Sequence, residues 1–255
     1  MSAALPLTGV VIAQDEADRI GRCLDSLARV CADVVVLDSG SKDATVAVAR
    51  AAGARVEHQP WLGFAGQKNA AIARATQPWV LLLDADEWLD DAAPARLRAL
   101  FASGEVERAD VWTLPRRMWF LGRPLDHGGL GREPVQRLFR ARLRYRDAEV
   151  HEALDTAGAR VDRVDARIEH ATARSLDEQV RKQARYAELA ARQAHARGRR
   201  AGALSAPLHA FAYWLRAYVV RGGFLDGRAG WIYHLSHARY VHRKYVVLRG
   251  LCAGR

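Results

Sequence analysis

The sequence has little cysteine. Its three cysteines, Cys23, Cys31 and Cys252, are odd in number and include no Cys-x-x-Cys pair. The sequence therefore predicts neither a disulfide framework nor a zinc knuckle, and its cysteine use fits a reducing compartment.

Signals for membrane insertion and export are missing as well. No apolar run approaches the roughly 18 residues that a membrane-spanning helix needs. The first residues, MSAALPLTGVVIAQDEADR, carry no basic segment and pass from a short apolar stretch into acidic residues. We therefore do not expect them to act as a secretory signal.

Acidic residues are scarce in the last third of the chain. Residues 174–255 contain 16 Lys/Arg and 4 Asp/Glu, a net charge of +12, whereas residues 1–173 contain 23 and 25, a net charge of −2. This basic third predicts an anionic partner, for which nucleic acid and anionic lipid are both candidates. The 255 residues, half of them apolar, suffice for one buried core with an appended subdomain.

Strand-like and helix-like segments alternate over the first 110 residues. Strands are expected at 7–13, 34–37, from 56, and at 79–83, and helices at 20–30, 43–52, 66–75 and 92–102. This alternation predicts an α/β fold with a parallel sheet, in which ligands bind beyond the carboxyl ends of the strands.

The alternation ends near residue 111. Short strand-like pieces at 111–114, 135–139 and 166–168 accompany a Gly/Arg/Pro-rich loop at 122–134, and helices are expected at 175–197, 204–220 and about 226–248. Ser175-Leu176-Asp177-Glu178 is a capping box for the first of these helices. The change of pattern predicts a change of role along the chain.

Two carboxylates, Asp84 and Asp86, flank Ala85 at the end of the predicted strand Trp79–Leu83. Such close like charges are costly unless a cation neutralises them. Mg²⁺ and Mn²⁺ prefer oxygen ligands and bridge to substrate phosphates, where they stabilise a diphosphate leaving group. The alternative is a strand end followed by a helix cap, but the preceding VLLL and the polar residues after other strands favour a metal site.

Polar residues also follow the first two strands. Asp38 can accept a hydrogen bond from a nucleobase, or it can form a turn within Asp-Ser-Gly-Ser. Glu16 can bind a ribose or base, or be a solvated charge. Lys68, at a helix start, can meet a diphosphate, or be a surface lysine, and we assign Asp43 to helix capping. We expect the strand ends to converge on one cleft.

Four segments resemble glycosyltransferase family 2, whose fold is GT-A. They are VVIAQDEADRIGRCLDSL (10–27), VVVLDSGSKDAT (34–45), GFAGQKNAAIARA (63–75) and WVLLLDADEWLD (79–90). Further segments at 116–129, 135–140, 150–154 and 223–245 look like the branch of that family that builds the lipopolysaccharide core by adding glucose to an inner-core heptose.

The resemblance implies a Rossmann-like GT-A domain that binds a nucleotide-sugar, with a basic helical C-terminal extension. It divides the chain into a nucleotide-binding half (1–115), an acceptor-side half (116–173) and a basic amphipathic region (174–255). The implied reaction is an inverting, metal-assisted transfer of a sugar, glucose from UDP-glucose, to a lipopolysaccharide or other lipid-linked glycan. The cofactor is Mg²⁺ or Mn²⁺.

Site residues follow by position in the resemblance. Glu16 and Asp38 become nucleotide contacts, and Asp84 and Asp86 hold the diphosphate and the metal. Two places depart from the family pattern: Asp15-Glu16 stands where Asn-Glu is frequent, and Arg132-Glu133-Pro134 stands where Pro-Asp is frequent.

Inversion by direct displacement needs one general base on the acceptor side. We expect this base within residues 120–155, with Glu152 as the first choice and Glu133 as the second. His127 and His151 are candidates for metal or phosphate contact, although histidines chosen in this way are more often structural.

Two arginines of the same region can bind phosphates on an anionic acceptor. Arg137 and Arg140 alternate with apolar residues, which is equally the pattern of an ordinary amphipathic strand.

The basic helices carry tryptophan and tyrosine among their apolar residues, a composition that suits a membrane interface. We therefore expect a peripheral enzyme on the cytoplasmic, inner face of the bacterial inner membrane, with an anionic membrane surface as partner. Solvated helices packed on the catalytic domain are the alternative. Nucleic acid is not expected, because no helix-turn-helix, zinc, RRM or KH signature is present.

Two other functions compete with the glycosyltransferase. A nucleotidyltransferase would normally have a Gly-rich, basic loop after the first strand, where this chain has acidic Gln14-Asp15-Glu16-Ala17. A non-catalytic protein that binds glycolipid or nucleic acid would bind a nucleotide diphosphate without turnover.

Overall fold

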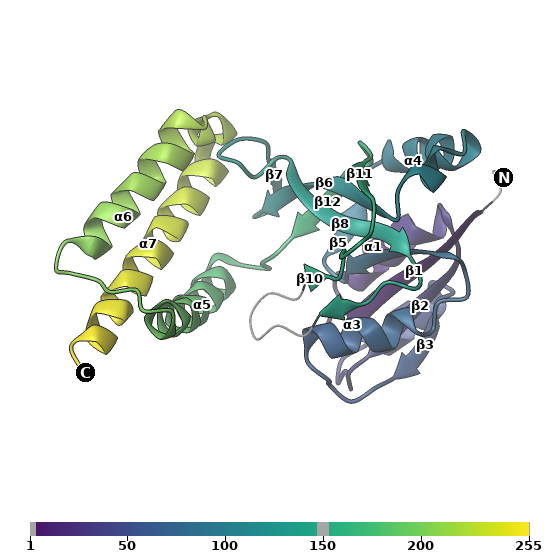
Figure 1. Cartoon of the computed structure of the whole chain (residues 1–255), viewed down its shortest axis with the longest axis horizontal. Helices are drawn as coiled ribbons and strands as arrows, with labels where there is room; N and C mark the ends of the chain where they lie inside the picture. Colours follow the sequence, from purple (N-terminus) through teal and green to yellow (C-terminus); the bar gives the residue numbers. More distant parts are fainter. Residues whose placement is uncertain (1–3, 147–152, 255) are drawn as a thin grey trace. The chain divides into compact units, whose positions relative to one another are not determined.

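The computed structural model describes residues 4–146 and 153–254, which form two compact units (Figure 1). The sheet unit comprises residues 1–116 and 134–170, and the helical unit comprises residues 117–133 and 171–255. The chain thus leaves the sheet unit once, contributes a segment to the helical unit, and returns before its C-terminal helices.

Four parallel strands form one half of the main sheet, in the order β3-β2-β1-β4. They are β1 (Leu5–Ala13), β2 (Cys31–Asp38), β3 (Arg55–His58) and β4 (Trp79–Asp84). The central residues of β1, β2 and β4 are apolar runs because both faces of these strands are covered, whereas the edge strand β3 has the sequence Arg-Val-Glu-His. The α/β class expected from the sequence is confirmed.

The other half of the main sheet continues in the order β8-β6-β12-β5. These strands are β8 (Glu133–Arg140), β6 (Val111–Phe120), β12 (Ile168–Ala171) and β5 (Glu87–Leu89). β8 runs antiparallel to β4, and β12 runs antiparallel to β5. The reversal at β8 places its side chains beside the end of β4, where Asp84 lies.

Short strands complete the β structure. β11 (Val161–Arg163) pairs with β6 in parallel, β7 (Arg123–Leu125) pairs with β6 antiparallel, and β9 (Tyr145–Arg146) pairs with β10 (Ala153–Leu154). None of the three β7, β9 and β10 was expected from the sequence.

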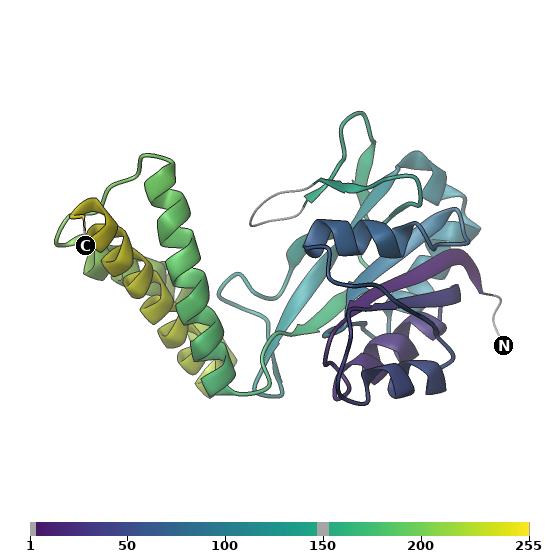
Figure 2. The same cartoon turned by 90° about the horizontal axis from the view of Figure 1, so that it is seen from below.

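Helices cover both faces of the sheet unit (Figure 2). α1 (Ile20–Ala28), α2 (Thr45–Ala51) and α4 (Ala93–Ala102) contribute to one hydrophobic cluster, and α3 (Phe64–Ile72) contributes to the other. A short 3₁₀ helix, η1 (Glu105–Arg108), follows α4. α3 thus lies on the opposite face from α1, α2 and α4, and its Lys68 side chain reaches Asp84 at the end of β4.

The helical unit contains α5 (Leu176–Ala196), α6 (Ser205–Trp214) and α7 (Gly227–Cys252). A π-helical turn, η2 (Leu215–Val220), continues α6, and a 3₁₀ turn, η3 (Gly223–Asp226), leads into α7. The N-cap half of the predicted capping box is confirmed, since the Ser175 hydroxyl accepts from the backbone N–H of Glu178; the Glu178 carboxylate in turn accepts from the N–H of Arg174. Among the described residues, no helix is both long and apolar enough to cross a membrane.

α7 packs against both other helices of this unit. It contacts α5 through the Ser236–Gln183 hydrogen bond and the Arg243–Glu188 ion pair. It contacts α6 through the ring of Tyr245, which stacks on His209 with 3.9 Å between centroids.

Residues 117–133 fold with the helices. Phe120 and Leu125 pack against Tyr233 of α7, and the backbone N–H groups of Asp126 and His127 donate to the Asp226 carboxylate. The division expected from the sequence assigns this segment instead to the acceptor-side half, residues 116–173.

Candidate active site

The loops after β1 and β2 are joined by hydrogen bonds. The backbone N–H of Asp15 donates to Ser41 Oγ at 2.9 Å, and the Asp15 carboxylate accepts from the N–H of Lys42 at 2.7 Å. Asp15 adopts a φ of +55°, a left-handed conformation that a short acidic side chain tolerates. The Asp43 carboxylate accepts from the N–H groups of both Ala17 and Thr45, so it ties the first loop to the start of α2.

Asp38 stabilises the turn that follows β2. Its buried carboxylate accepts from the N–H groups of Gly40 and Ser41 and from the Ser41 hydroxyl. This is the turn chemistry that the sequence offered as the alternative to a nucleobase contact. A nucleobase bound here would share acceptor oxygens that the turn already uses.

Glu16 and Asp86 are connected through one arginine. The Arg19 guanidinium lies 2.5 Å from Glu16 Oε2 and 3.6 Å from Asp86 Oδ2. The acidic residues after β1 and β4 therefore lie close together, as the parallel-sheet argument predicted.

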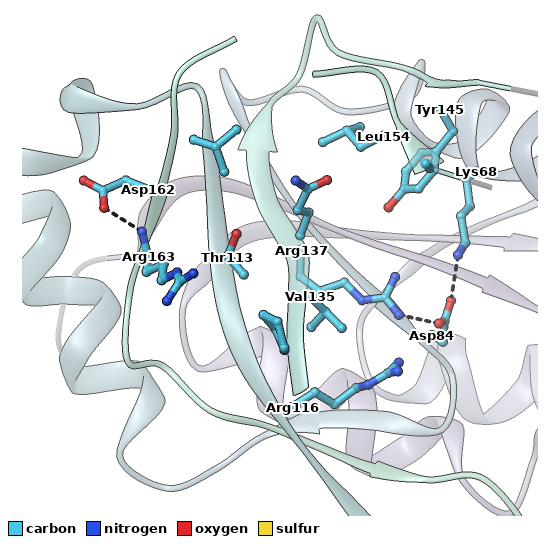
Figure 3. Close-up of a pocket in the computed structure, with 14 residues that line it drawn as sticks. Lys68, Asp84, Thr113, Arg116, Val135, Arg137, Tyr145, Leu154, Asp162 and Arg163 are labelled. Atoms are coloured by element: carbon cyan, nitrogen blue, oxygen red, sulfur yellow. Dashed lines mark hydrogen bonds and ion pairs between the residues drawn. The ribbon is translucent and has the colours of Figure 1, made fainter. Parts of the chain in front are cut away.

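Asp84 lies between two cations from different elements (Figure 3). Lys68 Nζ on α3 is 3.3 Å from Asp84 Oδ1, and Arg137 on β8 is 2.5 Å from Asp84 Oδ2. Arg137 also lies 2.8 Å from Glu87, whose side chain is fully buried. Arg116 on β6 contacts the same Glu87 oxygen at 2.9 Å. Three cations and two carboxylates thus alternate in one cluster.

The charges of this cluster hold Asp84 ionised. Burial by itself would raise the pKa of Asp84, but Arg137, Lys68 and His170 outweigh it and lower this pKa well below its usual range. Arg137 responds in the opposite sense: despite burial, Asp84 and Glu87 raise its pKa. Both groups are therefore charged at neutral pH.

Asp86 faces a histidine from the far edge of the sheet. Its Oδ1 lies 3.4 Å from Nε2 of His170 on β12, and both side chains are largely buried. Burial would raise the pKa of Asp86, but the hydrogen bond and charge of His170 lower it below its ordinary value. The other ring nitrogen of His170, Nδ1, is buried and has no hydrogen-bond partner in the part of the chain that the structure describes.

The residues present fit a divalent cation that is only partly held by protein. A carboxylate oxygen and an imidazole nitrogen 3.4 Å apart are a suitable pair of ligands for Mn²⁺, whereas Mg²⁺ prefers oxygen and would be bound mainly through Asp86. No group of three or more His, Cys, Asp or Glu side chains suited to a metal occurs among residues 4–146 and 153–254. Such an ion would need further oxygens, which a diphosphate can provide.

Three consecutive residues of α3 organise the surroundings of Asp84. Gln67 donates to Ser39 and to the carbonyl of Gln59, Lys68 pairs with Asp84, and Asn69 exchanges two hydrogen bonds with the backbone of Tyr145. Lys68 is buried, so its alternative as a surface lysine is ruled out.

A cavity of about 720 Å³ opens beside this cluster in the sheet unit. Figure 3 shows Lys68, Asp84, Arg137 and Tyr145 on one side of the cavity and Arg163 on the other. Asp38 and Glu16 are not among its lining residues. A cavity of this size and basic lining can accommodate an anionic ligand of several groups.

The remaining predicted site residues are distributed differently. Arg137, expected on the acceptor side, belongs to the Asp84 cluster, whereas Arg140 pairs with Glu107 and lies over the Trp79 ring. Glu133 is exposed at the start of β8. His127, in the helical unit, donates from Nδ1 to the Asp226 carboxylate at 2.8 Å. His151 and Glu152 lie outside the described residues.

Several site residues were not singled out from the sequence. Glu87 and Arg116 complete the Asp84 cluster, Arg19 links Glu16 to Asp86, and His170 faces Asp86. Glu87 stands directly after the DxD and was within reach of a pattern argument. A lone histidine at the end of a short strand, such as His170, carries no comparable signal.

Comparison with known proteins identifies the family to which this chain belongs. The model of glycosyl transferase family 2 matches residues 9–153. The chain is 30% identical over 261 residues to the lipopolysaccharide core biosynthesis glycosyltransferase LpsC of Rhizobium meliloti, covering 97% of this chain and 96% of that protein. It is 38% identical over 102 residues to a glycosyltransferase of Rickettsia felis, covering 40% of this chain and 36% of that one.

A solved structure shares the fold over most of the chain. S. aureus TarS 1–349 in complex with UDP-GlcNAc aligns with a TM-score of 0.52 and 16% identity, covering 98% of this chain and 93% of that one. At this identity the likeness concerns the fold, which is the expected GT-A type of α/β structure. The chain is a glycosyltransferase and belongs to glycosyltransferase family 2.

Proposed function

We propose that this enzyme transfers a sugar from a UDP-sugar to a lipopolysaccharide core acceptor, with inversion at the anomeric carbon. The observation that carries the proposal is the pair of carboxylates at the end of β4, one set among cations and the other facing His170, beside a cavity of about 720 Å³. The similarity to LpsC over nearly the whole chain supports the acceptor class. Glucose as the transferred sugar rests on the family resemblance.

The cations of the site suit a diphosphate. Lys68, Arg116 and Arg137 outnumber the carboxylates Asp84 and Glu87 in their cluster. Preorganised positive groups stabilise the charge that grows on a diphosphate as its bond to the sugar breaks, without reorganising during the reaction. Asp84 keeps Lys68 and Arg137 in position while no ligand is bound.

Asp86 and His170 are the residues that would hold a divalent metal, Mg²⁺ or Mn²⁺. Asp84, the other metal ligand expected from the sequence, pairs with Lys68 and Arg137, so we propose it as a ligand only once a diphosphate has engaged these cations. When bound, the metal would add positive charge at the leaving diphosphate. Arg19, 3.6 Å from Asp86, holds this carboxylate toward the loop after β1. The small number of protein ligands predicts that metal and nucleotide bind synergistically.

Inversion requires one displacement. The acceptor hydroxyl oxygen forms a bond to the anomeric carbon, the bond from that carbon to the diphosphate oxygen breaks, and a carboxylate takes the hydroxyl proton. Glu152 is our first proposal for this base and Glu133 the second. The products are the β-linked glycan, if the donor is α-linked, and UDP.

A metal-dependence assay tests the donor half of the proposal. UDP- and ADP-sugars are screened for binding with and without Mn²⁺ or Mg²⁺, and sugar release is then followed for the tightest donor. We expect Asp86→Asn and His170→Gln to raise the metal concentration needed for half-maximal turnover by at least about tenfold, since each removes one of two ligands. Asp91→Asn, which changes an exposed carboxylate that pairs with Arg29, is the matched control. Unchanged metal dependence in both site variants would refute the assignment.

Acceptor and base need a second measurement. Transfer to truncated core oligosaccharides identifies the acceptor, and the anomeric configuration of the product distinguishes inversion from retention. We expect Glu152→Gln to lower kcat by about 10²- to 10⁴-fold with little change in donor binding, the usual contribution of a general base. If only Glu133→Gln has this effect, the second choice is correct; if neither has it, the base lies elsewhere.

We expect the enzyme to bind a membrane, because its proposed acceptor is linked to a lipid. A lipid-linked glycan and the basic last third of the chain are the grounds for proposing an anionic surface on the inner face of the inner membrane as its partner.

A further inference from the structure

One side of α6 and its π-helical continuation is apolar and uncovered. Leu204, Leu208, Phe211, Leu215 and Val219 follow one another at intervals of three or four residues, which places them on one face. Their exposed fractions lie between 41% and 68%. We call these five residues the apolar stripe.

The opposite side of α6 makes the packing contacts of the helix. His209 stacks on Tyr245, and the Tyr213 hydroxyl lies 3.1 Å from Nδ1 of the buried His234. α6 is thus already anchored to α7, and the apolar stripe is not needed for that contact.

Aromatic rings extend the apolar stripe across the neighbouring turn. Trp214 lies 5.2 Å from Tyr218 between ring centroids, and Tyr218 lies 5.3 Å from Trp231 of α7 and 6.3 Å from Phe224 of η3. Phe224 and Trp231 are themselves 49% and 43% exposed. Tryptophan and tyrosine beside aliphatic residues are the composition of a membrane–water interface.

The charged residues of the last part of the chain are almost all basic. Residues 189–255 contain 12 Lys/Arg and a single acid, Asp226. The Asp226 side chain is only 5% exposed and accepts from the backbone and ring of His127. Arg216, Arg221 and Arg228 are exposed on the same stretch of chain as the stripe. Asp126, whose N–H donates to Asp226, is 48% exposed but pairs with Arg117, so an anionic surface meets net attraction here.

We infer that the apolar stripe, with Phe224 and Trp231, is the face by which this enzyme docks on an anionic lipid bilayer. The side chains enter the boundary between headgroups and acyl chains, and the arginines pair with lipid phosphates. The inference deepens the proposed function, because a lipid-linked acceptor gives the enzyme a reason to bind a membrane. It specifies which surface binds and that binding requires apolar insertion as well as charge.

Vesicle co-sedimentation tests the inference with the full chain. The probes are vesicles of phosphatidylethanolamine with phosphatidylglycerol, and vesicles of phosphatidylcholine alone. We expect wild-type protein to bind the anionic vesicles and Phe211→Ser/Leu215→Ser to bind at least about tenfold more weakly, because two large apolar side chains no longer leave water. Val180→Ser/Leu189→Ser, which changes two exposed apolar residues of α5, is the matched control and should bind as wild type.

Charge is tested separately with Arg216→Gln/Arg228→Gln. We expect this variant to bind anionic vesicles more weakly and to lose most of the salt dependence of binding. Circular dichroism on each variant confirms that the helices are retained.

The outcomes separate this inference from the proposed function. Equal vesicle binding by Phe211→Ser/Leu215→Ser and by wild type overturns it. So does wild-type protein that ignores anionic vesicles but self-associates, or that binds a nucleic-acid duplex, through the same residues. Donor hydrolysis measured without vesicles should be unchanged in the stripe variants. Wild-type protein that binds anionic vesicles but turns over no nucleotide-sugar would count against the proposed function alone.

Discussion

Arg137 connects two carboxylates that belong to different parts of the site. It is 8% exposed, contacts Asp84 at 2.5 Å and fully buried Glu87 at 2.8 Å, and its Nε lacks a hydrogen-bond partner among the described residues. Buried charges are tolerable only when they are paired, so removing this one cation leaves Glu87 with Arg116 and Asp84 with Lys68.

We therefore expect Arg137→Met to lower the free energy of unfolding by about 3 kcal/mol, at the lower end of the range for broken buried pairs because Asp84 is partly exposed. Arg29→Met is the control, since both side chains of the Arg29–Asp91 pair are exposed and the pair should contribute less than about 1 kcal/mol. Urea denaturation measures both. Similar midpoints for the two variants would show that Arg137 is not needed to balance the buried charge.

The sequence pattern identifies Asp84 and Asp86 as site residues, but it does not predict which residues pair with them. Two aspartates after VLLL form a local pattern, whereas Arg137 reaches Asp84 only because β8 runs antiparallel beside β4 with Leu81 opposite Leu138. His170 meets Asp86 only because β12 pairs with β5. Strand order and register across distant segments decide these contacts, and periodicity does not encode them.

At the scale of elements, α7 and η3 approach each other closely at two glycines, Gly230 and Gly223. A Cβ on Gly230 would lie 2.2 Å from the carbonyl oxygen of Gly223, a backbone atom that cannot rotate away. Glycine at this position is required by close approach.

Gly230→Ala should accordingly lower the free energy of unfolding by about 1–3 kcal/mol through overpacking, despite the better helix propensity of alanine. Gly202→Ala, where a Cβ would meet nothing within 4 Å, should be neutral or slightly stabilising. Thermal unfolding compares the two. A Gly230→Ala protein as stable as Gly202→Ala would mean that the turn moves aside at little cost.

The start of α5 gives a second element-scale expectation. The Ser175 hydroxyl satisfies the N–H of Glu178, one of the groups that a helix start leaves without a partner. Ser175→Ala should cost about 1 kcal/mol of stability, and Ser175→Asp should restore most of it. Chemical denaturation followed by circular dichroism measures the series; no loss in the alanine variant would show that water caps this helix equally well.

The helices and strands differ in how clearly the sequence predicts them. The parallel strands and α1 were predicted because buried strands are continuous apolar runs and Ile20, Leu24 and Leu27 recur at helical spacing. β5, β9 and β10 have two or three residues each, too few for any period to be recognised. Their formation depends on the strands beside them.

For the whole molecule, acid sensitivity is expected to arise in the helical unit. Burial, together with the neighbouring His234, lowers the pKa of His237 from 6.5 to about 4. The rings nearest to His237 are Tyr213 of α6 and Tyr233 and Tyr240 of α7. The histidine is therefore neutral in the folded protein over a range in which the unfolded chain is protonated.

The unfolded state binds more protons between pH 6.5 and about 4, so stability must fall as pH decreases through this window and stay level above it. The loss is on the order of 3 kcal/mol for His237. His237→Gln should reduce the slope in that window to the part that comes from His234, whose pKa burial also lowers. The loss below pH 4, which comes from carboxylates with lowered pKa values such as Asp84 and Asp86, should remain. Urea midpoints at intervals of half a pH unit test this; an unaltered profile would exclude His237 as the source.

The path of the chain between the two units has a consequence for synthesis on the ribosome. Residues 117–133 emerge early, yet Phe120 and Leu125 pack on Tyr233, and Asp126 and His127 bond to Asp226, about one hundred residues later in the chain. During translation the apolar side chains of this segment therefore stay exposed to solvent until α7 has left the exit tunnel. A ribosome-bound chain stopped near residue 200 should thus be cleaved by protease within 117–133, whereas the released full-length protein is protected there.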